Sequence, residues 1–336
     1  MAFLIQSTMT FAIPLMIVAL GGVFAERSGI INIALEGIMI FGAFIGVYVV
    51  KAFIDSGITP EMGQAILPLI ILIVCAAGAI FALLLAFASI NLKADQTIGG
   101  TALNLLAPAL VLFLILIICQ QNSLTIESRY SPSDYFMLSY KTFGFESRSA
   151  MNTLQQIFCD KIYTTTFYAI VIFIVLSIIL YKTKFGLRLR ACGENPQAAA
   201  SLGINVYKMR YIGVVISGAL AAFGGFIYAL TSASCTSTGE VAGMGFLALA
   251  VMIFGNWKPI NIALAALLFG MLKAISVGYA SIDINGDGIY LLEKLKISKH
   301  IYRLIPYVIT IIVLAFTSKS SRAPKAEGQP YDQGKR

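Results

Sequence analysis

The side chains that could bind a polar solute are few, and the first two interrupt a long apolar run. Asn32 and Glu36 lie in GIINIALEGIMIFGAFIG, at 29–46. Four residues apart, they share one face if this run is helical. An ionisable side chain inside a membrane span is costly and tends to face a cavity or a partner. The spacing predicts that the pair lines a solute pathway or braces a broken helix. The alternative is that Glu36 pairs with Arg27.

A second apolar run carries neutral hydrogen-bonding groups. In TIGGTALNLLAPAL, at 97–110, Thr101 and Asn104 face the same side of a helix that Pro108 interrupts. An amide and a hydroxyl suit a polar, uncharged solute. Asparagine equally joins helices to one another in membranes, so both interpretations stay open here.

A third polar break precedes a short apolar run. Glu240 and Phe246 belong to GEVAGMGF, which begins at Gly239. Its glycines allow irregular backbone, which is tolerated at membrane depth only where it is buried or lines a cavity. The segment is predicted to line the pathway, and a plain outer turn is the alternative.

Other kinds of chemistry find little support in the sequence. There is one histidine, His300, and the five cysteines lack metal-ligand spacing. No G-x-x-x-x-G-K-[ST] motif is present, so ATP would have to bind to another subunit. We therefore expect a protein that is not an enzyme and has no metal or cofactor of its own.

Two further motifs leave alternatives open. The run that begins at Asp283 matches the start of a calcium loop, but Lys294 stands where a bidentate glutamate is needed. A turn rich in Asp and Asn is favoured over a calcium site. Cys119 and Cys159 either form a disulfide or remain free thiols.

The composition indicates that most of the chain lies in lipid. It has 336 residues, of which 58% are hydrophobic and only 12% are charged. Soluble domains carry roughly 25% charged residues. The net charge of +8 is concentrated in a few loops, as expected for cytoplasmic loops rather than for binding to nucleic acid.

The fold class predicted is an all-α, polytopic membrane protein with about nine spans and broken helices. A span needs about 20 apolar residues. The seventh candidate is too short to cross alone unless it is tilted or broken. The candidates are 4–24, 30–50, 65–90, 99–119, 164–181, 209–231, 244–256, 259–278 and 304–318. Gly42 and Gly46 in the second form a GxxxG pattern, which permits close helix contact.

The basic loops predict the orientation. Lys and Arg dominate the loop 182–208 and the tail 319–336, so both are expected in the cytoplasm. Counting spans back from there places the N-terminus outside and makes 120–163 a long outer loop. The transmembrane domain is predicted to cover 1–318, and the polar tail is predicted to be disordered.

The basic loop contains a short helix with clear end signals. Asparagine and proline favour its start, an alanine-rich stretch follows, and glycine supplies a left-handed stop. A small exposed helix on the cytoplasmic side of a membrane protein suggests a docking surface for a soluble motor. The residues assigned to it are Glu194, Asn195, Pro196, Ala198, Ala199 and Gly203.

The segments 21–44 and 224–255 resemble each other. Each has a Gly-Gly pair in a span, a polar break, a glutamate close to a glycine and a second apolar run. Transporters often contain such repeats with broken helices at the solute site. Coincidence in apolar, glycine-rich sequence is the alternative.

Several of these motifs together resemble one family. ERSGIINIALEGIMIFGAF, GLRLRACGENPQAAASLGI and GVVISGALAAFGGFIYAL are similar to permease subunits of bacterial ABC importers in the branched-chain amino acid, ribose and nucleoside group. Within it, SGIINIALEG with ADQTIGGTALNLLA looks most like the guanosine and purine-nucleoside importers. The resemblance covers about 10–318. Ribose-type relatives carry D-L-S-V-G where this chain has Asn32–Glu36, which argues against a sugar.

The resemblance implies a complex in the bacterial inner membrane. Its parts would be this permease, a second and paralogous permease, an ATP-binding subunit and an external substrate-binding lipoprotein docked near 120–163 and 232–243. Asn195–Gly203 would be the helix that couples to the ATPase. The alternatives are an ABC permease for a sugar or a branched-chain amino acid, or a stand-alone secondary transporter. The last would need buried charges, and only Glu36 and Lys273 qualify.

Overall fold

The computed structural model describes residues 2–126, 130–138, 161–278 and 323–332, with nine single positions between 155 and 315. Helices dominate, and one two-residue antiparallel pair of strands joins β1 (Met137–Leu138) to β2 (Ile162–Tyr163). The helices are α1 (Ala2–Arg27), α2 (Leu35–Asp55), α3 (Pro60–Ala86), the π-helical turn η1 (Phe87–Asn91), α4 (Gln96–Cys119), α5 (Pro132–Phe136), α7 (Thr164–Lys182), α8 (Lys184–Glu194), α9 (Pro196–Ser201), α10 (Val206–Thr231), α11 (Met244–Phe254) and α12 (Pro259–Gly278).

Seven helices in the described part are long and apolar enough to cross a membrane. They correspond to seven of the nine predicted spans, and α3 continues through η1 as one of them. The seventh candidate, 244–256, is the 11-residue helix α11. At 1.5 Å per residue it covers about half of a hydrocarbon core roughly 30 Å thick. Most of the ninth, 304–318, lies outside the described residues, as do the Asp283 motif and Cys159.

Helix α4 differs from its prediction at one position. The helix runs unbroken through Pro108, as α1 does through Pro14 and α3 through Pro68. Proline is tolerated inside spans because neighbouring helices and local adjustments satisfy the freed carbonyls. The start of α4 is fixed by Asp95, whose carboxylate accepts hydrogen bonds from Thr97 N and Ile98 N, and these bonds lower its pKa.

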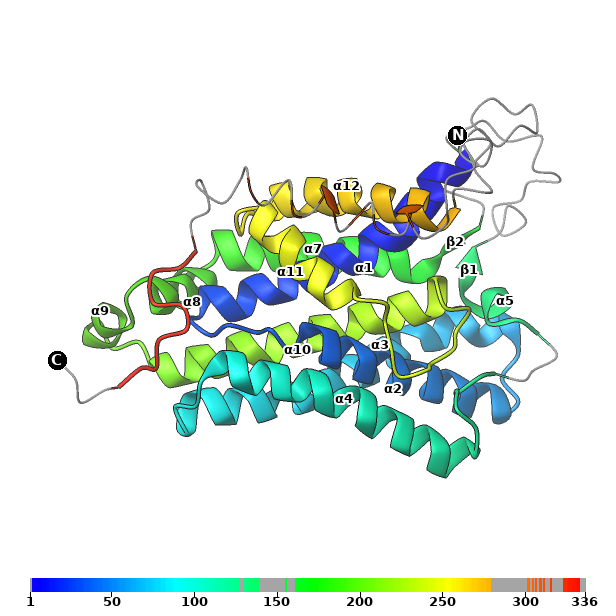
Figure 1. Cartoon of the computed structure of the whole chain (residues 1–336), viewed down its shortest axis with the longest axis horizontal. Helices are drawn as coiled ribbons and strands as arrows, with labels where there is room; N and C mark the ends of the chain where they lie inside the picture. The colour runs from blue at the N-terminus through cyan, green and yellow to red at the C-terminus, as the bar shows by residue number, and fades with distance from the viewer. Residues whose placement is uncertain are drawn as a thin grey trace.

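Helix α10 lies at the centre of the bundle and packs against α1, α2 and α3 (Figure 1). Helices α4 and α7 lie at the outside, and only 22% of the most apolar stretch of α4 is buried. Since lipid or a partner must cover an apolar helix that is exposed to this extent, α4 is available for a membrane-embedded contact.

The GxxxG pair of α2 packs directly onto α10. A Cβ atom at Gly42 would lie 2.3 Å from Ala222 Cα, and one at Gly46 would lie 2.2 Å from the Phe226 ring. The predicted close helix contact is therefore present, between α2 and α10.

Adding one methyl group at Gly42 should disrupt this contact. Gly42→Ala places its Cβ against backbone that cannot move aside, and we expect a loss of about 2 kcal/mol or more in stability. Gly99→Ala is the matched control, because its Cβ would meet only Leu85 Cδ1 at an ordinary 3.4 Å. Thermal unfolding of both variants in detergent checks this. Equal midpoints for the two would show that the α2–α10 contact is looser than described.

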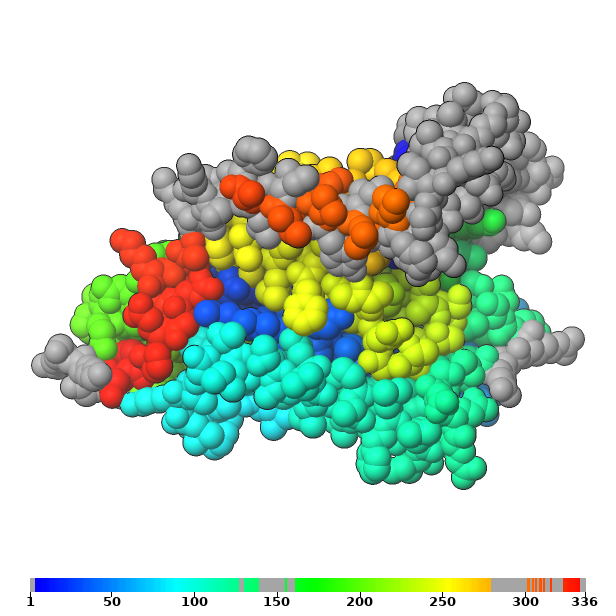
Figure 2. Space-filling view, viewed as in Figure 1, coloured from blue at the N-terminus to red at the C-terminus, as the bar shows by residue number. Residues whose placement is uncertain are grey.

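The two ends of the bundle carry different structures. The start of α1, α5 and the β1–β2 pair gather at one end, and α8 and α9 lie at the other (Figure 1). Residues 323–332, which we name the C-terminal strap, lie on the surface beside α8 and α9 (Figure 2, red). Disorder was predicted for 319–336, but the structure packs this part, and Ala326 and Tyr331 are each 5% exposed.

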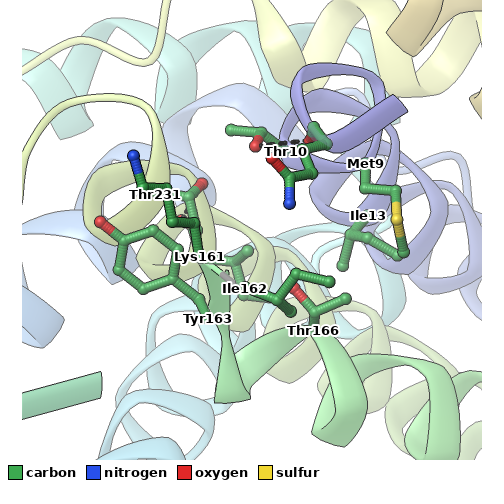
Figure 3. Close-up of a pocket in the computed structure, with 10 residues that line it drawn as sticks. Met9, Thr10, Ile13, Lys161, Ile162, Tyr163, Thr166 and Thr231 are labelled. Carbon is green, nitrogen blue, oxygen red and sulfur yellow. Dashed lines mark hydrogen bonds between the residues drawn. The ribbon is translucent and has the colours of Figure 1, made fainter. Parts of the chain in front are cut away.

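The end that holds the strands has a small hollow between α1, α7, α10 and β2. Gln6, Thr10, Tyr163 and Thr231 are among the residues that line it (Figure 3). Its volume of about 20 Å³ has room for about one water molecule. It is therefore too small to be the entrance for an organic solute.

Candidate functional site

The chain breaks its helical path between α1 and α2. After Arg27 the backbone turns at Gly29, where φ is +96°, and α2 begins only at Leu35. Asn32 is fully buried in this break. Its Oδ1 accepts a hydrogen bond from Ala34 N at 3.1 Å, and its Nδ2 donates to Ser217 Oγ of α10 at 2.8 Å. The prediction that Asn32 and Glu36 share a helical face is wrong, because Asn32 precedes the helix.

Glu36, in the first turn of α2, caps a different helix. Its carboxylate accepts hydrogen bonds from Gly243 N at 2.9 Å, Gly245 N at 2.5 Å and Phe246 N at 3.3 Å. These amides belong to the start of α11, where backbone donors have no partner within the helix. A negative charge there is also favoured by the helix dipoles of α2 and α11.

The alternative partner for Glu36 is not the one observed. Arg27 Nη1 instead forms an ion pair with Glu194 Oε1 of α8 at 3.2 Å. Arg27 therefore connects the end of α1 to α8 and not to α2. Glu36 depends on the start of α11, which lies more than 200 residues away in the chain.

Asn104 of α4 is hydrogen-bonded both to the break and to the start of α2. It accepts a hydrogen bond from Gly37 N at 2.8 Å and donates to Ile33 O at 2.9 Å. Gln96 adds a second link, because its Oε1 accepts a hydrogen bond from Ile31 N at 2.7 Å. The polar groups of Asn32, Glu36 and Asn104 therefore brace the broken helix, and each of them ties it to a different helix: α10, α11 and α4 respectively.

Three of the other predicted pathway residues reach the surface. Thr101 and Glu240 are exposed, and Phe246 is 51% exposed. Thr101 Oγ1 donates to its own helix, towards Thr97 O and Ile98 O. In Figure 2 the blue N-terminal part of the chain is visible between the cyan α4 and the yellow α11. We name this surface between α4 and α11 the open face.

The predicted short helix is present as α9. Asn195 accepts a hydrogen bond from Ala198 N at 3.0 Å, Pro196 opens the helix, and Gly203 has a φ of +79° just after its end. Ala198 is exposed, but Ala199 is 3% exposed and packs inward. A second helix, α8, precedes it and was not predicted.

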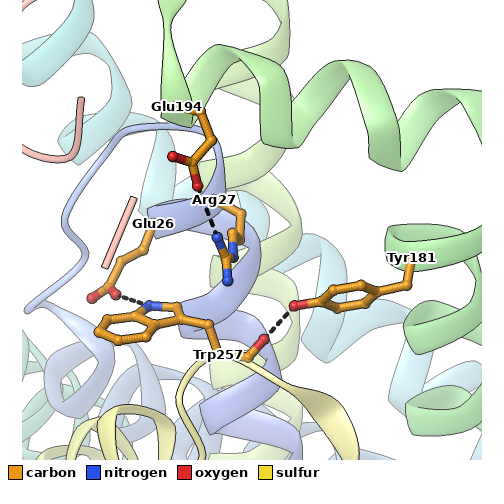
Figure 4. Close-up of polar contacts among 5 residues, drawn as sticks. All are labelled: Glu26, Arg27, Tyr181, Glu194 and Trp257. Atoms are coloured by element: carbon orange, nitrogen blue, oxygen red, sulfur yellow. Dashed lines mark hydrogen bonds and ion pairs between the residues drawn. The ribbon is translucent and has the colours of Figure 1, made fainter. Parts of the chain in front are cut away.

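Helix α8 joins α9 to the end of α1 (Figure 4). The Arg27–Glu194 ion pair connects them, and a Cβ at Gly193 would lie 2.4 Å from Arg27 O. The Trp257 indole donates to the buried Glu26, and the Tyr181 hydroxyl donates to Trp257 O. Helix α8 is therefore in direct contact with the end of α1, just before the break.

Comparison with known proteins identifies the family. A model described as "Branched-chain amino acid transport system / permease component" matches residues 4–314. The chain belongs to this family of permeases.

Two of its relatives match over nearly the whole chain. The permease is 40% identical to the guanosine ABC transporter permease protein NupQ of Bacillus subtilis, over 100% of this chain and 98% of that protein. It is 39% identical to the nucleoside ABC transporter permease protein NupC of Lactococcus lactis, over 99% and 97%. NupB of Lactococcus lactis, also named a nucleoside ABC transporter permease protein, is 25% identical over 74% and 65%. No solved structure matches the chain.

Two residues that hold the permease's break from neighbouring helices, Ser217 of α10 and Gln96 of α4, were missed by the sequence analysis. Ser217 gives no signal, because a single serine in an apolar helix is common. Gln96 follows Asp95, the cap of α4, and a polar residue at that point could have been noted. Its Nε2 has no partner among the described residues.

Proposed function

We propose that this chain is the membrane-spanning permease subunit of an ATP-driven nucleoside importer in the bacterial cytoplasmic membrane. The observation that carries the proposal is the 40% identity over the full chain with a protein named for guanosine transport. The 39% identity with a second protein named for nucleoside transport supports it. The chain would form the path, and a separate subunit would bind and hydrolyse ATP.

The open face is proposed as one wall of the solute path. Of the two helices that border it, α4 carries the exposed Thr101 and α11 carries the exposed Phe246, a hydroxyl and an aromatic ring. An aromatic ring can stack on a nucleobase, and neutral polar groups can bind a sugar hydroxyl. The second wall would come from another permease. NupB and NupC share an organism and a transport name, which supports two different paralogues in one complex.

Asn32, Glu36 and Asn104 are proposed to act on the path by positioning its walls. Their hydrogen bonds fix the starts of α2 and α11, so a shift of the break would tilt both helices. A carrier of this kind needs different affinities for the solute in its two states rather than tight binding. Glu240 would lie at the outer rim of the path.

Helix α9 is proposed to seat in the ATP-binding subunit. The basic residues of 182–208 favour the cytoplasmic side for this end, and the C-terminus would then be cytoplasmic. At the other end, Leu124 and Ser237 exchange backbone hydrogen bonds of 2.9 and 3.0 Å. They join the two outer segments proposed to receive the substrate-binding lipoprotein.

Uptake of labelled guanosine tests the substrate class. Cells that carry this chain with its neighbouring transport genes should accumulate guanosine, and cells that lack only this chain should not. Labelled ribose and leucine are the controls. Accumulation of ribose or leucine in place of guanosine would replace the nucleoside proposal with a sugar or amino acid permease. Uptake that persists without any ATP-binding subunit would indicate a stand-alone transporter.

A further inference from the structure

The C-terminal strap is attached through main-chain groups to three parts of the bundle. Ala326 N donates to Gly193 O of α8 at 2.9 Å, and Gly328 N donates to Gly29 O in the break at 3.2 Å. Gln329 O accepts a hydrogen bond from Arg210 Nη1 of α10 at 2.9 Å. Main-chain bonds of this kind fix the course of the strap whatever its side chains are.

The last residues of the strap reach α9. Asp332 O accepts a hydrogen bond from Gln197 Nε2 at 2.9 Å, and its carboxylate pairs with Lys93 at 3.0 Å. The Tyr331 ring lies edge-on to Tyr207, with centroids 5.2 Å apart. Only a few residues of the strap therefore separate its contact with the break, at position 328, from its contact with α9, at position 332.

Arg210 shows that the strap belongs to the packed structure. The guanidinium of this residue is buried, with 1% of the residue exposed, and it lies 6.0 Å from the Tyr331 ring centroid. The strap supplies the hydrogen bond to its Nη1. If the strap left, Arg210 would lose this hydrogen bond, and the Tyr331 ring would move from a buried position into water, which is unfavourable for an apolar ring.

Tyr331 also forms one wall of a hollow beside α9. The other lining residues are Ala200 of α9 and residues 203–207, which connect α9 to α10 and include the start of α10, and the volume is about 240 Å³. Leu202, which directly precedes this segment, is 82% exposed. Lys184, Arg188 and Lys208 are exposed on the neighbouring helices. This end of the bundle thus combines an exposed apolar residue beside α9, a side-chain-sized hollow and exposed basic residues on the neighbouring helices α8 and α10.

We infer that α9 and the C-terminal strap form one composite docking surface for the ATP-binding subunit, and that the strap connects α9 to the break between α1 and α2. The inference rests on the proposed role of α9. The partner surface that fits is a groove with an acidic rim and one protruding side chain for the hollow. Movement of α9 would reach the break by two routes, through α8 and Arg27 and through the strap.

The pKa of Glu327 decides the pH at which the variants should be compared. Burial raises the pKa of its carboxyl to about 7, while Arg27 lowers it. Glu26 and Arg27, both on α1, are the charged groups that act on it. Because the pKa of a free glutamate is lower, packing of the strap weakens as the pH rises through about 7. Binding of the variants to the ATP-binding subunit is therefore compared at one pH, near 6, during co-purification from membranes.

Truncation provides the first test. A chain ending after residue 322 should bind the ATP-binding subunit at least about fivefold more weakly in co-purification from membranes, and guanosine uptake should fall to a similar extent. Tyr331→Ala, which removes only the wall of the hollow, should give a smaller loss of the same sign. A chain that lacks only residues 333–336 is the control. Binding and uptake within twofold of the intact chain after truncation would overturn the inference.

A crosslinking experiment distinguishes this inference from an alternative in which the strap blocks transport and must leave α9 during each cycle. Gln197→Cys with Asp332→Cys, joined by a short thiol-specific reagent, holds the strap on α9. Uptake should persist, since the two elements act together. Loss of uptake on crosslinking, restored by cleaving the reagent, would mean that the strap must leave during transport and would overturn the inference. Each single cysteine variant controls for side reactions, and Cys192 is protected because burial raises its pKa to about 11.

The same cells distinguish failure of the inference from failure of the proposed function. If an exposed substitution in α9 abolishes uptake while truncation does not, α9 docks alone and the strap has no part in docking. If neither change affects ATP-driven uptake, the coupling role of α9 fails as well. Immunoblots of the membrane fraction confirm that each variant is present in equal amount.

Discussion

Guanosine uptake should fall by at least about tenfold when Ala198→Arg and Leu202→Glu are combined. Ala198 is exposed and Leu202 is 82% exposed, so neither substitution disturbs the interior of the protein. A loss of only 1.4 kcal/mol in binding of the ATP-binding subunit is a tenfold loss in affinity. Burying two new charges in a docking groove costs at least that much unless each finds a partner. Ala199 is avoided because it packs inward.

The matched control lies at the other end of the bundle. Met62 is 55% exposed near the start of α3, so Met62→Arg adds a charge of the same kind far from α9. Its uptake should stay close to that of the unmodified chain. The measurements are initial uptake rates and the amount of each chain in the membrane. Normal uptake by the α9 variant, at normal abundance, would contradict the docking role of α9.

The spans were predictable because they depend on local sequence. Each of the seven long helices is an apolar run of sufficient length, and lipid leaves the backbone no other partner than itself. The same holds for α9, where Asn195, Pro196 and Gly203 specify both ends within nine residues. Signals of this kind do not require knowledge of the rest of the fold.

The brace at the break was only half predictable. An intramembrane Asn and Glu mark a special site, but the periodic pattern extended the helix back through Asn32 and so gave the wrong geometry. The start of α2 is decided by contacts with α4, α10 and α11, between 67 and 210 residues away. Such pairings are tertiary, and no window of sequence contains both partners.

The packing of the C-terminal strap was not predicted, again because it depends on tertiary contacts. Its Lys, Gly, Pro and Gln composition is typical of disorder because it offers little apolar surface. One aromatic ring, Tyr331, and a row of main-chain donors and acceptors are enough to pack it, because Tyr207 and Arg210 provide a prepared surface. The signal lies in α10 and not in the tail itself.

Glu36→Ala should destabilise the protein by about 3 kcal/mol or more. The substitution leaves the amides of Gly243, Gly245 and Phe246 without their acceptor in a buried place. Hydrogen bonds to charged groups each contribute about 1.5–3 kcal/mol, and unpaired buried donors add their own penalty. The thermal unfolding midpoint in detergent should fall clearly, and uptake should fall with it because α2 and α11 lose their fixed starts.

Graded variants decide between a brace and a solute ligand at Glu36. Glu36→Gln keeps one acceptor oxygen but brings an amide group against backbone N–H donors, so its stability should lie between those of the intact protein and Glu36→Ala. Glu240→Ala is the control for stability alone, because Glu240 is exposed and only a few residues from the same start of α11. A brace predicts that stability and maximal uptake rate fall together, with little change in the guanosine concentration that gives half-maximal uptake. If Glu36→Gln instead left stability intact and raised that concentration severalfold, Glu36 would contact the solute and the brace would be the lesser role.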